Sequence, residues 1–264
     1  MTFPKSPRVV YGQDTLSQVV CALNFPPILS IGSETPAALQ EALRTEYPLY
    51  EARPAGGQLQ LAGAPPGLVE MLGQFPLGQG QTALQHRFTT EDESRSVVVG
   101  PRLLAVEDTD YEEWSSFYQN VASARIAVEE IYRPAFYARV GLRYQNVIRR
   151  EMLKDGAVWT DVIKPTFLGL LGTPEIDTVK ELAGAALIEL DLAGSLVRVN
   201  HGLATDEQSS DVVYLIDADF YTEERCNGAE IDDILGYFNS EAGNLFRWAI
   251  TTELHDALGR RNAH

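Results

Sequence analysis

The amino-acid sequence predicts an α+β fold made of two related lobes, in each of which an antiparallel sheet packs against a long helix. Short segments of alternating apolar residues recur along the chain, separated by turns rich in Gly, Pro, Asn and Asp, which is typical of antiparallel strands. Two longer segments instead repeat apolar residues every three or four positions, which indicates amphipathic helices. Prolines and glycines at 151–184 mark a transition between two such series, so the lobes are placed at 1–150 and 151–264.

The first lobe is predicted to be ferredoxin-like, with the element order βαββαβ. Its strands are expected at 16–25, 86–90, 96–107 and 136–150. Its first helix is expected over 37–47, with a hydroxyl cap before Pro36. Its second has apolar positions from Trp114 to Ile131, begins after Thr109 or Asp110 and stops at Pro134. Residues 53–82 are rich in Gly, Pro, Ala and Gln, which predicts a flexible excursion with one short helix over 66–72.

The second lobe begins after a transition at 151–184 that contains several prolines and glycines and a short predicted helix over 175–182. Residues 185–191 and 195–202 flank Leu192-Ala193-Gly194 and are expected to form a hairpin. A strand of high β propensity follows at 211–223, and one long helix is expected over 230–258, ended by Gly259. The two lobes are expected to dock as one unit.

Composition limits the classes of function. The 264-residue chain has 21 Lys and Arg against 37 Asp and Glu, which gives a net charge of −16. Such a field repels phosphate backbones, so direct binding of nucleic acid is not expected. Solubility explains an acidic surface by itself, and a basic partner surface is the functional alternative.

Cysteine and histidine usage predicts a cytoplasmic protein without a metal or other cofactor. Cys21 and Cys226 lie far apart, the four histidines are solitary, and no pair has the spacing of a zinc site. The first residues lack the layout of a signal peptide, and no apolar segment reaches the roughly 20 residues of a membrane span. His201 could act as a base, but no nucleophile motif accompanies it, which favours a turn or interface role.

The most informative segment is the strand FYARVGLRYQNVIRR at 136–150. Strand alternation places Arg139, Gly141 and Arg143 on one face and apolar residues on the other. Two guanidinium groups separated by a residue without a side chain need carboxylates, carbonyl groups or a partner if they are buried.

The strand DVVYLIDADFYTE at 211–223 supplies matching carboxylates, because Asp217 and Asp219 lie two residues apart on one face. We expect them to face Arg139 and Arg143 across the lobe junction in a charge network that fixes how the lobes dock. The same residues allow two other interpretations. One is a site that recognises a ligand or partner, and the other is a metal or catalytic site.

Several segments together resemble a sporadically distributed bacterial family of about this length that has no established activity. The most specific is the R-x-G-L-R-Y-x-N element, which contains Arg139 and Arg143 and ends at Asn146, so Asn146 is counted with the arginines and aspartates as a residue of the binding or structural network. The segments LSQVVCALNF, YEEWSSFYQNV, LIDADFY and the closing helix with Phe246 extend the likeness over nearly the whole chain. The resemblance implies a gene that travels with mobile or defence-related loci and encodes an accessory subunit; it supplies no catalytic residue.

The functional prediction is therefore a non-enzymatic subunit that binds another protein with a basic surface, in a bacterial defence (CRISPR-like) or toxin-control system. It is expected to bind neither nucleic acid directly nor a membrane. The first alternative is a metal-dependent hydrolase or nuclease that uses Asp217, Asp219 and Glu223. The second is a sensor whose small anionic ligand lies between Arg139 and Arg143.

Overall fold

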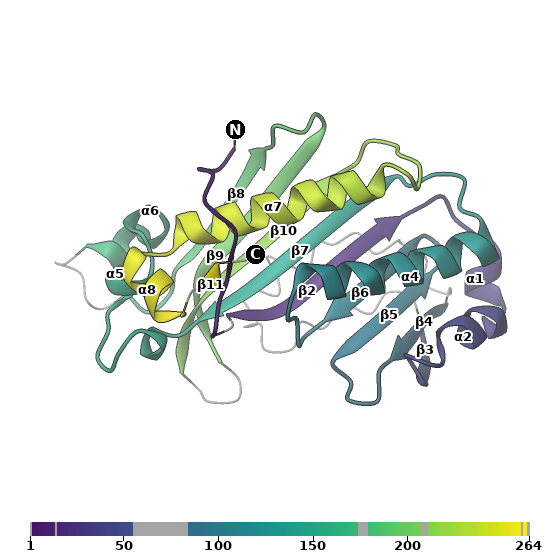
Figure 1. The fold of residues 1–264 in the computed structure, drawn as a ribbon, viewed down its shortest axis with the longest axis horizontal. Coiled ribbons are helices and arrows are strands. Elements are labelled where there is room, and N and C mark those ends of the chain that lie inside the picture. Colours follow the sequence, from purple (N-terminus) through teal and green to yellow (C-terminus); the bar gives the residue numbers. More distant parts are fainter. Residues whose placement is uncertain are drawn as a thin grey trace.

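One antiparallel sheet of nine strands forms the centre of the molecule in the computed structural model, which describes residues 2–13, 15–54, 84–173, 179–206, 211–259 and 261–262 (Figure 1). The strand order is β3-β4-β5-β6-β2-β7-β10-β9-β8. This confirms the predicted α+β class and the antiparallel sheet. Strands from both predicted lobes belong to this sheet, and β7 of the first lobe pairs with β10 of the second where the two segments meet.

The strands of the sheet are β2 (Leu16–Asn24), β3 (Leu49–Pro54), β4 (Leu84–Thr89), β5 (Arg95–Gly100), β6 (Leu103–Asp108), β7 (Arg139–Ile148), β8 (Ala183–Glu189), β9 (Ser195–Thr205) and β10 (Val212–Thr222). A separate two-stranded ribbon joins β1 (Val9–Val10) to β11 (Arg261–Asn262). The helices are α1 (Leu29–Ser33), α2 (Ala37–Leu43), α4 (Trp114–Tyr132), α5 (Trp159–Val162), α6 (Pro165–Leu168), α7 (Ile231–Ala249) and α8 (Thr252–Ala257), with 3-10 turns η1 (Arg150–Met152) and η2 (Gly169–Gly172).

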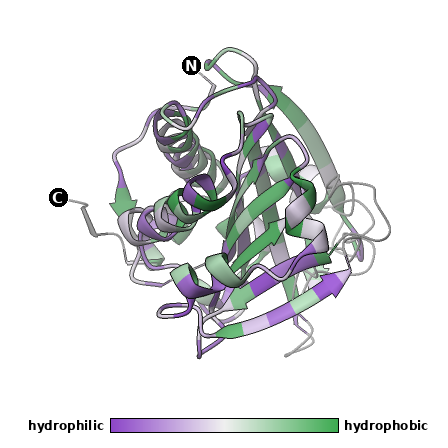
Figure 2. Ribbon diagram, turned by 90° about the vertical axis from the view of Figure 1, so that its right-hand side faces the viewer, coloured by the Kyte–Doolittle hydropathy of each residue, from purple (hydrophilic) through white to green (hydrophobic). Residues whose placement is uncertain are grey.

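The two long helices, α4 and α7, lie side by side on the same face of the sheet (Figures 1 and 2). Strand alternation turns one set of side chains toward them, and this set forms the main apolar core with the buried faces of the helices. Phe117 of α4 and Phe238 of α7 are buried in it. The opposite face carries two smaller buried apolar clusters and most of the charged residues of the central strands.

The first half contains more strands than the four that a ferredoxin-like lobe requires. The segment 96–107 is a hairpin of β5 and β6, because Pro101 and Arg102 form a turn that the strand prediction overlooked. Residues 49–54, which were not predicted as a strand, form β3 at the sheet edge. The predicted excursion at 53–82, with its helix at 66–72, lies outside the described residues except for Arg53 and Pro54 in β3.

Several helix boundaries also differ from prediction. Helix α2 follows Pro36 as its N-cap, and α4 begins after Glu113, in neither case with a side-chain cap. The predicted helix over 230–258 is two helices, because Ile250 is extended and bridges to Ile163 before Thr251 caps α8. Of the predicted helix over 175–182, the described residues 179–182 are not helical. Where the structure describes the chain, no helix is long and apolar enough to cross a membrane.

Candidate functional site

Arg143 and Asp217 form a buried ion pair on the sheet face opposite the helices. Adjacent strands β7 and β10 bring them together, with Asp219 directly across from Arg143 and Asp217 one step along the same face. Arg143 Nε donates a hydrogen bond to Asp217 Oδ1, and the two side chains are only 6% and 2% exposed. Asn200 of β9 donates a longer bond, of 3.4 Å, to Asp217 Oδ2. Both carboxylate oxygens of Asp217 therefore accept hydrogen bonds from within the sheet.

Arg139 and Asp219 form a second pair beside the first. Arg139 Nη2 lies 2.8 Å from Asp219 Oδ2, with the side chains 12% and 14% exposed. The Arg139 side chain lies along its own strand, and a Cβ at Gly141 would be 2.4 Å from Arg139 Nη1. The ring of Tyr221 lies 4.7 Å from the guanidinium carbon. Gly141 thus provides the space in which Arg139 reaches its carboxylate.

Burial makes the Asp219 carboxyl a weaker acid. Removal from water raises the pKa of its carboxyl above the ordinary value, and this effect outweighs the lowering by Arg139 and Arg143. The nearby charge of Asp217 raises this pKa further. The cost of removing the carboxylate from water therefore exceeds the stabilisation that the two arginines give it.

The structure does not bring every predicted site residue into this group. Asn146 lies on the helix-facing side of β7, where its Oδ1 accepts a 2.8 Å hydrogen bond from Thr15 Oγ1. Asn146 is two and four positions from Tyr144 and Leu142, so strand alternation places it on their face. The sequence motif had instead grouped Asn146 with the arginines. Glu223 follows the end of β10 and is exposed.

His201 lies within β9, whereas it was predicted at a strand end. Its Nδ1 is 2.8 Å from the Tyr214 hydroxyl, which donates a 2.7 Å hydrogen bond to the Phe167 carbonyl. Since the single hydroxyl proton is used on Phe167, His201 donates from Nδ1 to Tyr214. Burial lowers the pKa of the His201 imidazole. These contacts fasten α6 to the sheet.

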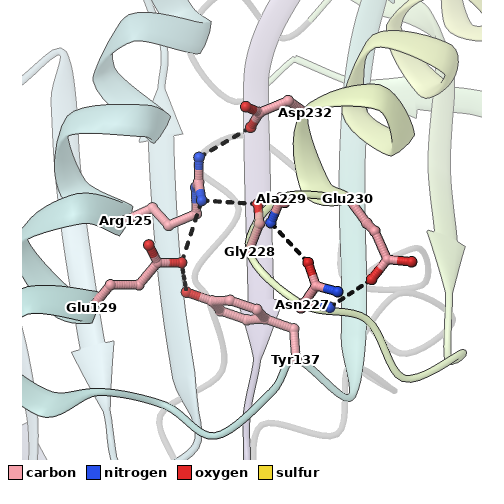
Figure 3. A network of polar contacts seen from close by, with 8 residues as sticks. All are labelled: Arg125, Glu129, Tyr137, Asn227, Gly228, Ala229, Glu230 and Asp232. Carbon is pink, nitrogen blue, oxygen red and sulfur yellow. Dashed lines mark hydrogen bonds and ion pairs between the residues drawn. The ribbon is translucent and has the colours of Figure 1, made fainter.

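A second charged network on the helix side of the sheet was not predicted (Figure 3). Arg125 of α4 donates to Glu129 Oε1 at 3.3 Å, to the Gly228 carbonyl at 3.0 Å and to Asp232 Oδ1 at 3.0 Å. The Tyr137 hydroxyl donates to Glu129 Oε1 at 2.9 Å. The network joins α4 to the start of α7. The sequence does contain an indication of this network. Arg125 follows Ala124 in the apolar stripe of α4, where a charged side chain becomes buried and needs partners.

A third buried acid, Glu107 of β6, lies on the same sheet face as the first two pairs. Its Oε2 accepts hydrogen bonds from Arg87 Nη2 at 2.7 Å and from Ser96 Oγ at 3.0 Å. Within the part of the chain that the structure describes, no three metal-ligating side chains come together. The chemistry visible on this face is pairing of carboxylates with guanidinium groups.

Comparison with known proteins gives no family for this chain: no protein-family model matches it, and no curated protein matches its sequence.

Proposed function

We propose that the protein is a cytoplasmic, non-enzymatic subunit that binds another protein and regulates or assists it, in a bacterial defence (CRISPR-like) or toxin-control system. The observation that carries the proposal is the pairing of Arg139 and Arg143 with Asp219 and Asp217. Each arginine is paired with an aspartate of the neighbouring strand, which favours a rigid sheet that presents a fixed surface to a partner. A metal-dependent hydrolase would instead need the same carboxylate oxygens for its ion.

The acidic surface supports a partner with a basic surface. The two sheet pairs are neutral in sum, so they contribute nothing to the 16 excess negative charges. Acidic side chains such as Glu112, Glu130 and Asp233 are exposed on and beside α4 and α7. An excess of negative charge accelerates association with a cationic protein and makes the rate depend on salt.

We further propose that the two halves are related lobes that dock as one unit. The likeness is clearest when β7, which the bound at 150 places in the first lobe, is taken as the start of the second half. β2 and β7 are then each followed by short helices and by strands that approach them from an edge of the sheet. The last of these strands pairs with the first, as β6 does with β2 and β10 with β7. A 19-residue helix, α4 or α7, follows. With β7 counted instead in the first lobe, as the bounds 1–150 have it, the order β5-β6-β2-β7 within the sheet supports a ferredoxin-like first lobe.

The function is tested by isolating a partner and rebuilding the complex from purified components. The tagged protein is used for affinity purification from its native host, and the recovered protein is expressed separately for binding kinetics at several salt concentrations. We expect the association rate to fall with salt, and to fall about tenfold when Glu112, Glu130 and Asp233 are changed to their amides. Gln119→Ala, an exposed change on α4 without loss of charge, is the control.

Catalysis would contradict the proposal. Hydrolysis of phosphodiester substrates with Mg²⁺ or Mn²⁺, retained through purification and lost in Asp219→Asn, would replace it by the metal-dependent enzyme. A complex that rebuilds equally fast at all salt concentrations would remove the charge argument.

A further inference from the structure

The two outermost strands of the sheet, β3 and β8, differ in how they are protected from pairing with another chain. Strand β3 is exposed along its length, but Glu51 and Arg53 form an ion pair of 2.8 Å on it and Pro54 ends it. Charges and proline are the usual devices that prevent a sheet edge from pairing. Strand β8, AGAALIE, contains no proline and no basic residue, and Glu189 at its end is its only charge.

Strand β8 is also accessible. Ala183, Ala185, Leu187 and Glu189 are exposed, with Leu187 52% exposed, and Ala186 is exposed on the other face. Among the described residues, β8 pairs with β9 alone. Its second edge therefore has main-chain groups that no described strand uses.

The register shows which main-chain groups these are. The amide of Leu203 donates to the carbonyl of Leu182, and the amide of Leu190 donates to the carbonyl of Ser195, both at 2.9 Å. Both pairs follow the register in which Gly184 faces His201 and Ile188 faces Val197. Even-numbered residues of β8 thus point their amides and carbonyls toward β9, and the odd-numbered residues point theirs outward.

We propose that β8 is the docking edge for an extended, cationic and apolar segment of a partner protein, which pairs with it as a tenth strand. The inference rests on the proposed protein-binding function and names the surface that carries it. Such a segment uses the outward amides and carbonyls of Ala183, Ala185, Leu187 and Glu189. Its apolar side chains would lie beside Leu187, and a basic side chain would meet Glu189.

Charge favours a cationic segment over a second copy of this chain. Antiparallel pairing of two β8 strands about Ala186 would place Leu187 opposite Ala185, but each copy brings a net charge of −16. A segment of opposite charge gains from that field, whereas a copy is repelled by it.

The test uses a defined probe, an acetylated ten-residue peptide of alternating valine and lysine, and a matched peptide of alternating valine and glutamate. We expect the lysine peptide to bind about tenfold more tightly than the glutamate peptide in fluorescence anisotropy. We also expect it to slow hydrogen exchange at β8 and to leave exchange at β3 unchanged.

Two variants separate edge pairing from general attraction. Ala185→Pro removes one outward amide without touching the bonds to β9 and should weaken peptide binding about tenfold. Glu51→Pro places the same residue on the β3 edge and should leave the affinity within about twofold. Thermal unfolding checks that both variants fold. If Ala185→Pro does not fold, Leu187→Lys replaces it, because the added positive charge should weaken binding of the lysine peptide while every main-chain amide is kept.

Three results would overturn the proposal. They are no binding of the lysine peptide, equal binding by Ala185→Pro or Leu187→Lys, and a dimer in sedimentation that Ala185→Pro dissociates, which would assign the edge to a second copy. Failure here is distinguishable from failure of the protein-binding function. A purified partner that binds wild type and Ala185→Pro equally retains that function at another surface, and the absence of any partner contradicts both.

Discussion

The two charged networks, one on the sheet and one between the helices, differ in burial and in what they connect. Arg143 and Asp217 are 6% and 2% exposed and belong to neighbouring strands that a ladder of main-chain bonds already joins. Arg125 is 11% exposed, its partner Asp232 is 48% exposed, and no strand ladder joins their helices. The sheet pair thus specifies register, since a slip by one residue would turn its charges into the apolar core. The helix network instead holds α4 against the start of α7.

The difference predicts that losing Asp217 is the most damaging change. Asp217→Ala removes the carboxylate that Arg143 Nε contacts in a buried site, and we expect the free energy of unfolding to fall by about 3–5 kcal/mol. Urea denaturation measures this. The double change Arg143→Met with Asp217→Leu removes both charges and should recover most of the loss. A double variant as unstable as Asp217→Ala would show that the pair contributes more than mutual neutralisation.

A smaller loss is expected in the helix network. Arg125→Met removes hydrogen bonds to Glu129, Gly228 and Asp232 and should lower the free energy of unfolding by about 1.5–3 kcal/mol. Asp232→Ala removes only the half-exposed partner and should cost under about 1 kcal/mol. The ratio of the two, measured in the same denaturant series, tests whether Arg125 is the centre of the network; equal effects would contradict it.

The space at Gly141 provides a sharper comparison within the sheet network. Gly141→Ala places a methyl group against Arg139 and should displace it from Asp219, at a cost of about 1–2 kcal/mol. Gly236 in α7 has nothing within 4 Å of an added Cβ, so Gly236→Ala should stabilise by about 0.5–1 kcal/mol. Opposite signs in thermal unfolding are the expected outcome. If both variants were stabilised, the Arg139 side chain would not lie against Gly141.

The weakest effect concerns pH. Because burial raises the pKa of Asp219 in the folded protein, its contribution to stability is fully present below the ordinary pKa of 3.8 and is lost as pH rises through the folded pKa. Asp219→Asn cannot titrate. The stability of wild type minus that of Asp219→Asn should therefore decrease as pH rises from about 3 to 7. A difference that increases over this range would mean that Arg139 lowers the pKa more than burial raises it.

Alternation alone was enough to place the four charged side chains of the sheet network on common strand faces, because strand geometry repeats every two residues. It did not show that β7 and β10 are neighbours, since pairing of strands whose ion-paired residues are 74 and 80 positions apart depends on the whole sheet. The resemblance motif grouped Asn146 with the arginines although its position in the strand turns it the other way. Asn146 is therefore close to Arg143 in the sequence but lies on the opposite face of the sheet.

The helix network and the sheet edges were harder to predict for a different reason. An arginine in an apolar stripe indicates a buried charge, yet its partners Gly228 and Asp232 come from the turn before α7 and from the start of that helix, more than 100 positions later. The prediction missed the turn at Pro101 and the end of α7 at Ile250, because the apolar pattern continues across both positions. Periodicity detects elements well, but the interruptions depend on tertiary contacts such as the bridge between Ile250 and Ile163.

The small ribbon of β1 and β11 restricts when the protein can finish folding. Val9 meets Asn262, so this pairing must wait until α7 and α8 have been synthesised. Because closing so long a loop costs entropy before the contact repays it, we expect the ribbon to form later than the hairpins of the sheet.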